Sequence, residues 1–213
     1  APERCAEALL LLDEITCGAR RIRELLAELT SLGVARPRRC AVADIVRSVL
    51  ALGLGRRAAL AVSVAAELPS ILASPGAIAQ VLLNLILNAL HAIAAQPGGQ
   101  VRLAATTERR AGRDYVVLTV ADNGPGMSAA VLARAGRRGF TTRAGGSGVG
   151  LSLCRSVVRA HHGVLRIDSA PGRGTTVTIH LPASPPPRPA PSPTDAPTDR
   201  PGPLPSSDSA PLS

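Results

Sequence analysis

The segment GFTTRAGGSGVGLSLC, residues 139–154, holds five glycines in its first twelve positions and then runs into an apolar helical pattern. Such a segment is either a loose linker or a backbone that closes around something for which side chains leave no room. It is not a P-loop, because that pattern needs a lysine and this loop has none. It is not a dinucleotide fingerprint either, because a turn and a short helix precede it rather than a strand. What remains is a lid whose last glycines, Gly146, Gly148 and Gly150, open a helix, where backbone N–H groups can bind phosphate oxygens.

A long apolar helix is predicted from Pro75 to about residue 95, because proline is favoured at the first helical position and aliphatic residues fill the turns that follow. Asn84 and Asn88 stand at i and i+4 on one face of this helix, and His91 follows three residues later. Two carboxamides in so apolar a helix are costly unless a partner satisfies them. They either hydrogen-bond within the core or offer an oxygen to a hard cation, which prefers oxygen ligands and keeps water and phosphate oxygens.

A third polar group, ADNGPGM at residues 121–127, follows an apolar strand. By itself such a cluster is typical of an ordinary turn. The alternative is that the Asp122 carboxylate accepts a hydrogen bond from a ligand, while Gly124 and Gly126 let the backbone come close to that ligand.

The composition limits the core and the partners. The formal net charge is +9, hydrophobic residues make up 46% of the 213, and aromatic residues only 1%, so the core must consist of Leu, Val, Ile and Ala. A basic chain suits nucleic acid or an anionic surface. However, no arginine cluster is interleaved with aromatic residues and no nucleic-acid-binding motif occurs, so we expect a solvated arginine-rich surface and no nucleic-acid partner.

The four cysteines, at positions 5, 17, 40 and 154, lack CxxC spacing and are expected to be free thiols in a reducing cytoplasm. No apolar run reaches the roughly 18 residues of a membrane-spanning helix. Because the chain begins with Ala rather than Met, we expect a fragment, and a membrane segment only upstream of it. The predicted location is the cytoplasm, or the cytoplasmic part of an inner-membrane protein.

The chain divides into three predicted parts, 1–36, 41–182 and 183–213. Residues 3–33 are predicted to form one helix with a heptad-like apolar seam, Leu12, Ile15, Ala19, Ile22, Leu26 and Leu29. Such a seam needs a partner, either another chain or a segment upstream. A linker over 33–40 leads to the second part. The tail is rich in Pro, Ser and Ala without apolar periodicity, and it is predicted to be disordered.

Helices and strands alternate in the second part. Helices are predicted over 42–54, 75–95, 128–135 and 148–161. Strands are predicted over 61–65, 100–106, 114–121, 163–169 and 175–181. Helices on one side of a mixed sheet make a two-layer α/β sandwich, an α+β fold.

Five short motifs occur in a fixed order: NLILNA at 84–89, DNGPG at 122–126, GFTT at 139–142, GSGVGL at 146–151 and GRGT at 172–175. They resemble the N, G1, F and G2 boxes, with the final Gly-Thr, of the catalytic ATP-binding domain of bacterial sensor histidine kinases. That domain belongs to the GHKL ATPase superfamily, together with gyrase, the Hsp90 chaperones and MutL. The resemblance covers about residues 40–182.

The resemblance implies a site for ATP and Mg²⁺. Asn88 matches the Mg²⁺ ligand, and Asn84 would support the phosphates one turn earlier. His91 stands where relatives often carry a polar or basic residue that reaches the phosphates. Asp122 would accept the exocyclic N–H of adenine, and Thr175 would support that contact.

Residues 128–147 would form the ATP lid, anchored by Phe140. The other residues implied to bind the nucleotide are Gly124, Gly126, Thr141, Thr142, Gly146, Ser147, Gly148, Val149, Gly150 and Leu151.

Hydrolytic relatives carry a Glu as general base where this chain has Asn84, and a carboxamide cannot accept a proton. The resemblance therefore implies phosphoryl transfer to a histidine rather than ATP hydrolysis, by positioning and charge neutralisation. Relatives often have Asp where Ser74 stands, and serine is expected to cap the helix equally well. His161 and His162 are expected to cap a helix end or to lie on the surface.

The helix at 3–33 is similar to the second helix of a dimerisation and phosphotransfer hairpin. This implies a homodimer, a phosphoacceptor histidine outside this chain, and a response-regulator Asp as the final acceptor. The fragment alone is not expected to phosphorylate itself. The alternatives are a nucleotide-binding module without transfer activity and a gyrase-like or MutL-like ATPase.

Overall fold

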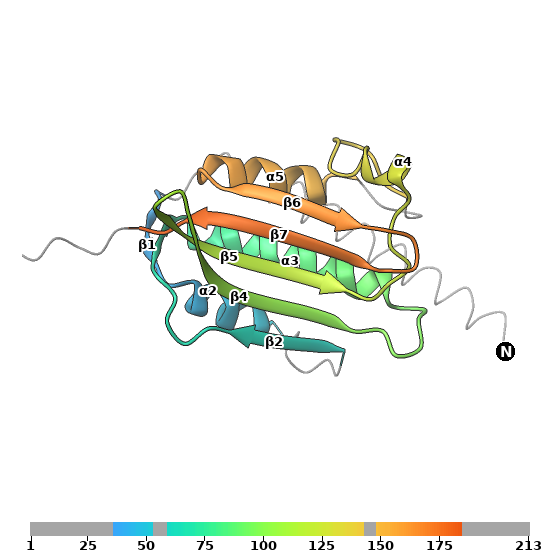
Figure 1. Cartoon of the computed structure of the whole chain (residues 1–213), viewed down its shortest axis with the longest axis horizontal. Coiled ribbons are helices and arrows are strands. Elements are labelled where there is room, and N and C mark those ends of the chain that lie inside the picture. The colour runs from blue at the N-terminus through green and yellow to red at the C-terminus, as the bar shows by residue number, and fades with distance from the viewer. Residues whose placement is uncertain (1–35, 53–58, 143–147, 185–213) are drawn as a thin grey trace, which may run out of the picture.

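The computed structural model describes residues 36–52, 59–142 and 148–184 (Figure 1). The helices in them are α2 (Val42–Leu50), α3 (Pro75–Ala92), α4 (Ala129–Leu132) and α5 (Gly150–Ala160). The strands are β1 (Arg38–Cys40), β2 (Leu60–Val64), β3 (Ile71–Ala73), β4 (Val101–Arg110), β5 (Arg113–Asp122), β6 (Val164–Ser169) and β7 (Thr175–Pro182). The helix expected at 3–33 and the tail beyond residue 184 lie outside the described residues, so the three-part division stays a prediction.

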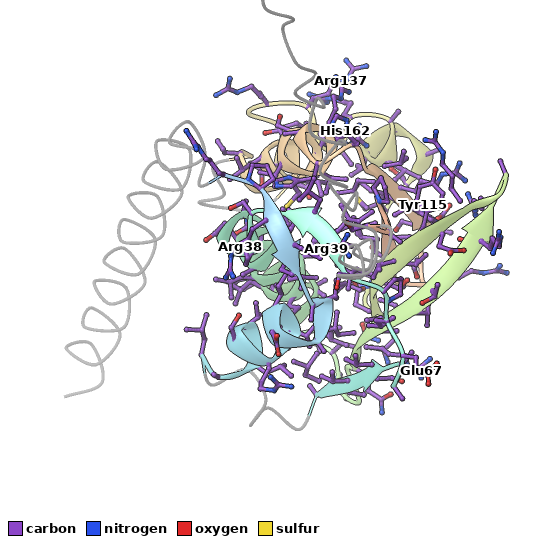
Figure 2. The ribbon with its side chains drawn as sticks, turned by 90° about the vertical axis from the view of Figure 1, so that its left-hand side faces the viewer. Arg38, Arg39, Glu67, Tyr115, Arg137 and His162 are labelled. Carbon is purple, nitrogen blue, oxygen red and sulfur yellow. The ribbon has the colours of Figure 1, made fainter. Side chains whose placement is uncertain are left out.

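The main sheet has five strands in the order β2-β4-β5-β7-β6. β2 runs parallel to β4, whereas the other neighbours are antiparallel, so the sheet is mixed. α2, α3 and α5 cover one face of it, with α3 between the other two (Figure 1). Figure 2 views the same two layers from the side, with Tyr115 of β5 on the sheet side and Arg38 of β1 on the helix side. The expected two-layer α+β sandwich is confirmed.

Aliphatic side chains fill the space between the layers. Val116, Leu118 and Val120 alternate along β5 and are at most 3% exposed, while Leu82 and Ile86 of α3 are not exposed at all. Burying one such side chain contributes about 1.5–3 kcal/mol. The period of two in the strand and of about four in the helix therefore fixes which face of each element meets the other.

The β4–β5 hairpin is longer than the sequence pattern predicts. The pairing runs from Val101 opposite Asp122 to Arg110 opposite Arg113. The outer part of β4 is polar and largely exposed, so it carries no apolar alternation by which to recognise a strand. The chain reverses through Ala111 and Gly112, both with positive φ (47° and 76°), as in a two-residue hairpin turn.

A second, two-stranded sheet was not predicted. β1 pairs antiparallel with β3, with Cys40 opposite Ile71. The expectation of a linker over 33–40 is therefore wrong for Arg38–Cys40. Each of these strands has only three residues, which is too short for a periodic pattern in the sequence. The burial of Ile71 and Ala73 in β3, each 1% exposed, becomes apparent only in the folded chain.

Of the described helices, only α3 is long and apolar enough to cross a membrane, with a mean hydropathy of 1.3 over 18 residues. It packs against α2, α5, β4 and β5. Its apolarity is therefore accounted for by its place in the core.

Candidate functional site

A row of polar side chains crosses the helix-facing side of the sheet at one end. The register places Ser169 of β6 opposite Thr175 of β7, and Thr175 opposite Asp122 of β5. These residues continue the inward-facing alternation of their strands, so all three point towards the helices. Each is half buried. Directly opposite residues in neighbouring strands have Cβ atoms about 4.5–5.5 Å apart, so the three side chains form one cluster.

The Asp122 carboxylate is held by the backbone on one side. Its Oδ1 accepts the Gly124 N–H at 2.9 Å and the Thr175 N–H at 3.2 Å. Among the described residues none donates to Oδ2. Burial raises the pKa of Asp122 above its ordinary value, and the two N–H donors oppose that rise. The carboxylate therefore has a fixed orientation and one oxygen able to accept a hydrogen bond from a ligand.

The glycines beside Asp122 allow two turns to pack together. A Cβ on Gly126 (φ +68°) would lie 2.0 Å from the Ala170 carbonyl oxygen, and one on Gly174 (φ +72°) only 1.9 Å from the Asp122 carbonyl oxygen. The Gly172 N–H also donates to the Pro125 carbonyl at 2.7 Å. The β6–β7 turn thus gives Gly126 a structural reason to be glycine, and its predicted close approach to a ligand stays a prediction.

A polar stripe runs along α3 at four-residue spacing. Gln80 Nε2 donates to Asn84 Oδ1 at 3.0 Å. Asn84 Nδ2 is buried and has no hydrogen-bond partner in the described part of the chain. It faces the first residue of α5, since a Cβ on Gly150 would lie 4.0 Å from it. Asn88, one turn further, is half buried.

The Cys154 thiol is the other group near Asn84. Burial raises the pKa of Cys154 to about 12, and the Asn84 amide acts against that rise. Sulfur is a weak acceptor, so this contact does not satisfy Nδ2. A buried N–H without a partner costs about 1–3 kcal/mol, and such a group calls for an explanation. The structure therefore leaves one donor aimed at the junction of α3 and α5.

The segment between α4 and α5 is fastened at two points. The Gly139 N–H donates to the Gly148 carbonyl at 3.2 Å, and a Cβ on Gly148 (φ +66°) would lie 2.5 Å from the Gly139 carbonyl carbon. The Arg134 guanidinium lies 4.2 Å from the centre of the Phe140 ring. This cation–π contact joins Phe140 to the turn after α4, and the role of Phe140 as anchor of an ATP lid stays a prediction.

The remaining residues predicted for the nucleotide fall into three groups. Thr141 and Thr142 are exposed beside Phe140. Val149 directly precedes α5, and its carbonyl accepts the Leu153 N–H at 2.9 Å, while Leu151 packs against the core. Gly146 and Ser147 lie outside the described residues. Arg137 and His162 mark the edge of the molecule formed by α4 and α5 in Figure 2, opposite Glu67.

All described parts of the predicted site lie at one end of the molecule. Figure 1 shows there the end of β5, the start of β7, the later turns of α3 and the start of α5. His91 is in the last turn of α3, three residues beyond Asn88, and is exposed. It lies on the rim of this region rather than inside it.

Two features were missed or misjudged. Ser169 was not singled out, because its importance lies in its register opposite Thr175 and not in any local motif. Ser74 does not cap α3 through its side chain. Instead its backbone N–H donates to His161 Nε2 at 3.0 Å, so the expectation of a serine cap is wrong. His161 caps α5 and also ties its end to the start of α3, whereas His162 is exposed.

Comparison with known proteins identifies the class. Residues 73–185, just over half of the chain, match the family of histidine kinase-, DNA gyrase B- and HSP90-like ATPases, and the chain belongs to this family. The sensor histidine kinase ZraS of Salmonella typhimurium is 39% identical over 115 residues, which make up 54% of this chain and 24% of that protein. The chain thus spans about a quarter of the length of the curated relatives it matches.

Solved structures agree on the fold. The mycobacterial sensor histidine kinase MprB aligns with a TM-score of 0.59 and 25% identity, over 70% of this chain and 99% of that one. Full-length ShkA in complex with AMPPNP aligns with a TM-score of 0.60 and 26% identity, over 76% of this chain and 35% of that one. The resemblance inferred from the motifs is confirmed at the level of the family and of the fold.

The residues present fit a magnesium nucleotide. Asp122 offers an acceptor, and the orphan Asn84 N–H faces the start of α5, where backbone N–H groups suit phosphate. In the described residues no group of three or more His, Cys, Asp or Glu could hold a metal ion. A cation here would therefore take its ligands from carboxamide oxygen, water and phosphate, which is what Mg²⁺ commonly does.

Proposed function

We propose that this chain is the ATP-binding catalytic region of a sensor histidine kinase. It binds Mg–ATP between α3 and the start of α5 and transfers the γ-phosphoryl group to a histidine outside this chain, from where it passes to a response-regulator Asp. The observation that carries the proposal is the convergence at one end of the fold of a fixed carboxylate, a carboxamide pair on α3 and a glycine at the start of α5. The ATP analogue in the ShkA complex supports it by similarity.

Asp122 would select the base. Its Oδ1 is engaged by two backbone N–H groups, so Oδ2 is the atom left to accept the exocyclic N–H of adenine. The half-buried position strengthens this bond because water competes less for the carboxylate.

Asn84, Asn88 and the start of α5 would hold the phosphates. The unpaired Asn84 Nδ2 donates to an oxygen, and Asn88 would be the one protein ligand of Mg²⁺. The ion supplies charge neutralisation of the phosphates during transfer. Phosphoryl transfer needs little else from the protein than position and electrostatic stabilisation.

The lack of a carboxylate on α3 favours transfer over hydrolysis. α3 contains no acidic residue, and the Asn84 oxygen already accepts a hydrogen bond from Gln80. A water molecule needs a base to become a good nucleophile, whereas neutral imidazole does not. This supports a histidine acceptor and argues against a gyrase-like ATPase.

The partners and the location follow from the same proposal. A seam of apolar residues in 3–33 would pair two copies of the chain. The catalytic region would work in the cytoplasm, and any membrane contact would come from a segment upstream. The similarity to sensor histidine kinases such as ZraS supports the sensor-kinase role from which this arrangement is proposed.

Two measurements test the proposal. Calorimetry with ATP should show binding that depends on Mg²⁺, weakened in Asn88→Ala and unchanged in His162→Ala, an exposed control outside the site. The protein should then phosphorylate a separately supplied helical hairpin carrying a His–Glu pair, giving an acid-labile, base-stable product.

The outcomes separate the alternatives. No magnesium-dependent binding of ATP would refute the site itself. Binding without phosphorylation of the hairpin, even when the upstream coding segment is restored, would leave a nucleotide-binding module. Steady ATP turnover by the protein alone would point to a hydrolase.

A further inference from the structure

The Ser169 hydroxyl lies at the meeting point of three groups from two turns. It accepts the Met127 N–H at 2.9 Å, it lies 2.9 Å from the Gly174 carbonyl oxygen, and it lies 3.0 Å from Thr175 Oγ1. Met127 belongs to the turn after Asp122, and Gly174 and Thr175 belong to the start of β7. Ser169 therefore joins both turns that border the Asp122 carboxylate.

The direction of each hydrogen bond follows from the chemistry of the groups. A serine hydroxyl has one hydrogen to donate and two lone pairs to accept with. The Gly174 carbonyl can only accept, and an oxygen–oxygen contact of 2.9 Å without a hydrogen between the atoms would be repulsive. The Ser169 hydrogen therefore goes to Gly174, and the two lone pairs receive the Met127 N–H and the Thr175 O–H.

This arrangement fixes what Thr175 can offer to a ligand. Thr175 donates its single hydroxyl hydrogen to Ser169, so Thr175 Oγ1 can offer a ligand only its lone pairs. The neighbouring Asp122 Oδ2 is also an acceptor. Two acceptors on opposite residues of β5 and β7 can accept hydrogen bonds from the amino group of a base, or from a water molecule that also donates to the base. They repel a carbonyl oxygen in the same place.

We propose that Ser169 is a positioning residue that sets base specificity: by taking the Thr175 hydroxyl hydrogen, it makes the site accept a 6-aminopurine nucleotide and reject a 6-oxopurine nucleotide. This rests on the proposed ATP site and deepens it. Ser169 does not itself contact the base. Its effect passes through Thr175, which distinguishes it from a residue that only holds the two turns together.

The test is a double-mutant cycle on base selectivity. Dissociation constants for ATP and for ITP, which carries a 6-oxo group, are measured with Mg²⁺ on the whole chain for the wild type, Ser169→Ala, Thr175→Val and the double variant. In Ser169→Ala the Thr175 hydroxyl is free to turn and donate to a carbonyl. We expect the preference for ATP over ITP to fall about 3- to 10-fold, the range of one neutral hydrogen bond.

The cycle separates positioning from structure. In the Thr175→Val background, adding Ser169→Ala should leave the ATP-to-ITP ratio unchanged, because the hydroxyl through which Ser169 acts is gone. Thr176→Val, on the other face of β7, is the matched control and should not change the ratio. If Ser169→Ala does not fold, Ser169→Cys, which has a much weaker donor and acceptor, carries the same test.

Two results would overturn the inference while leaving the ATP site intact. One is an equal loss of affinity for ATP and ITP in Ser169→Ala, which is what a purely structural role would give. The other is the same change of ratio with and without the Thr175 hydroxyl. A wild-type protein that binds no ATP at all would overturn this inference together with the proposed function.

Discussion

Replacing Asp122 by Asn should move stability and binding in opposite directions. Both backbone donors, from Gly124 and Thr175, meet the same oxygen, Oδ1, at 2.9 and 3.2 Å. A carboxamide oxygen placed there accepts both without any movement, and its NH₂ group then takes the position of Oδ2. The variant keeps the internal hydrogen bonds and loses the charge, whose burial raises the pKa of Asp122. Without nucleotide it should therefore be at least as stable as the wild type.

The raised pKa of Asp122 predicts how the stability difference between the wild type and Asp122→Asn changes with pH. The folded-state pKa of Asp122 lies above its unfolded value, so the wild type is relatively most stable where the carboxyl is protonated in both states. That stability is lost as the pH rises through the folded pKa. The advantage of Asp122→Asn should thus be largest at neutral pH and should vanish as the pH falls towards about 4, the ordinary value for Asp.

Binding should suffer, because the NH₂ group would face the adenine amino group, donor against donor. A hydrogen bond to a charged group contributes about 1.5–3 kcal/mol, so the dissociation constant for Mg–ATP should rise roughly 10- to 100-fold. Calorimetry measures the binding, and thermal unfolding from about pH 3.5 to 8, a range that includes the ordinary pKa of Asp, measures the stability. Asp114→Asn, an exposed carboxylate on the same strand, is the control and should change neither.

Two results would refute the reasoning about Asp122. A loss of several degrees in melting temperature at neutral pH would mean that the carboxylate is needed for the fold. Binding of ATP within twofold of the wild type would mean that Asp122 Oδ2 does not meet the base.

Three further predictions concern the scaffold. Ala111→Asn, at φ 47° in the hairpin turn, should stabilise the fold by about 0.5–1 kcal/mol, seen as a higher urea midpoint, and no gain would contradict the turn geometry. His161→Ala leaves the buried Ser74 N–H without an acceptor and should cost about 1–3 kcal/mol in the same assay, whereas Arg159→Ala, at an exposed position of α5, should cost little. Cys154, whose pKa burial raises to about 12, should resist iodoacetamide at pH 8.5 until the protein is unfolded, as followed on its own peptide by mass spectrometry, and fast labelling at Cys154 in the native protein would contradict its burial.

The sheet could be predicted wherever alternation of apolar residues continues, and only there. On the helix-facing side of β5 and β7 every second residue is apolar and buried, and the predicted limits of these strands are within about one residue of the observed ones. The polar outer half of β4 is a strand because β5 pairs with it, not because of its own side chains. β1 and β3 exist through their pairing with each other, and a pairing between residues some thirty positions apart leaves no local trace.

The candidate site likewise contains residues that a local sequence pattern indicates and one, Ser169, that it does not. Asn84, Asn88 and Asp122 could be singled out because each is a polar residue in an otherwise apolar local pattern. Ser169 has no such contrast: it is one more polar residue at the end of a half-exposed strand. Its hydroxyl matters because three groups from elsewhere in the chain meet it, and only the strand register brings them there.

The glycines illustrate that one sequence motif can have two structural reasons. A glycine that is needed for close approach has the same sequence signature whether a ligand or another part of the chain comes close. At Gly126 and Gly174 the approaching atoms belong to the protein: the Ala170 and Asp122 carbonyl oxygens would lie 2.0 and 1.9 Å from an added Cβ. A Cβ added to Gly150 would meet, outside the helix's own backbone and the neighbouring residues, only the Asn84 amide nitrogen among the described atoms, at 4.0 Å, and that nitrogen has no partner in the described part of the chain. The first two glycines therefore allow the turns beside Asp122 to pack together, whereas Gly150 is not crowded by the described residues and lies where we propose that phosphate binds.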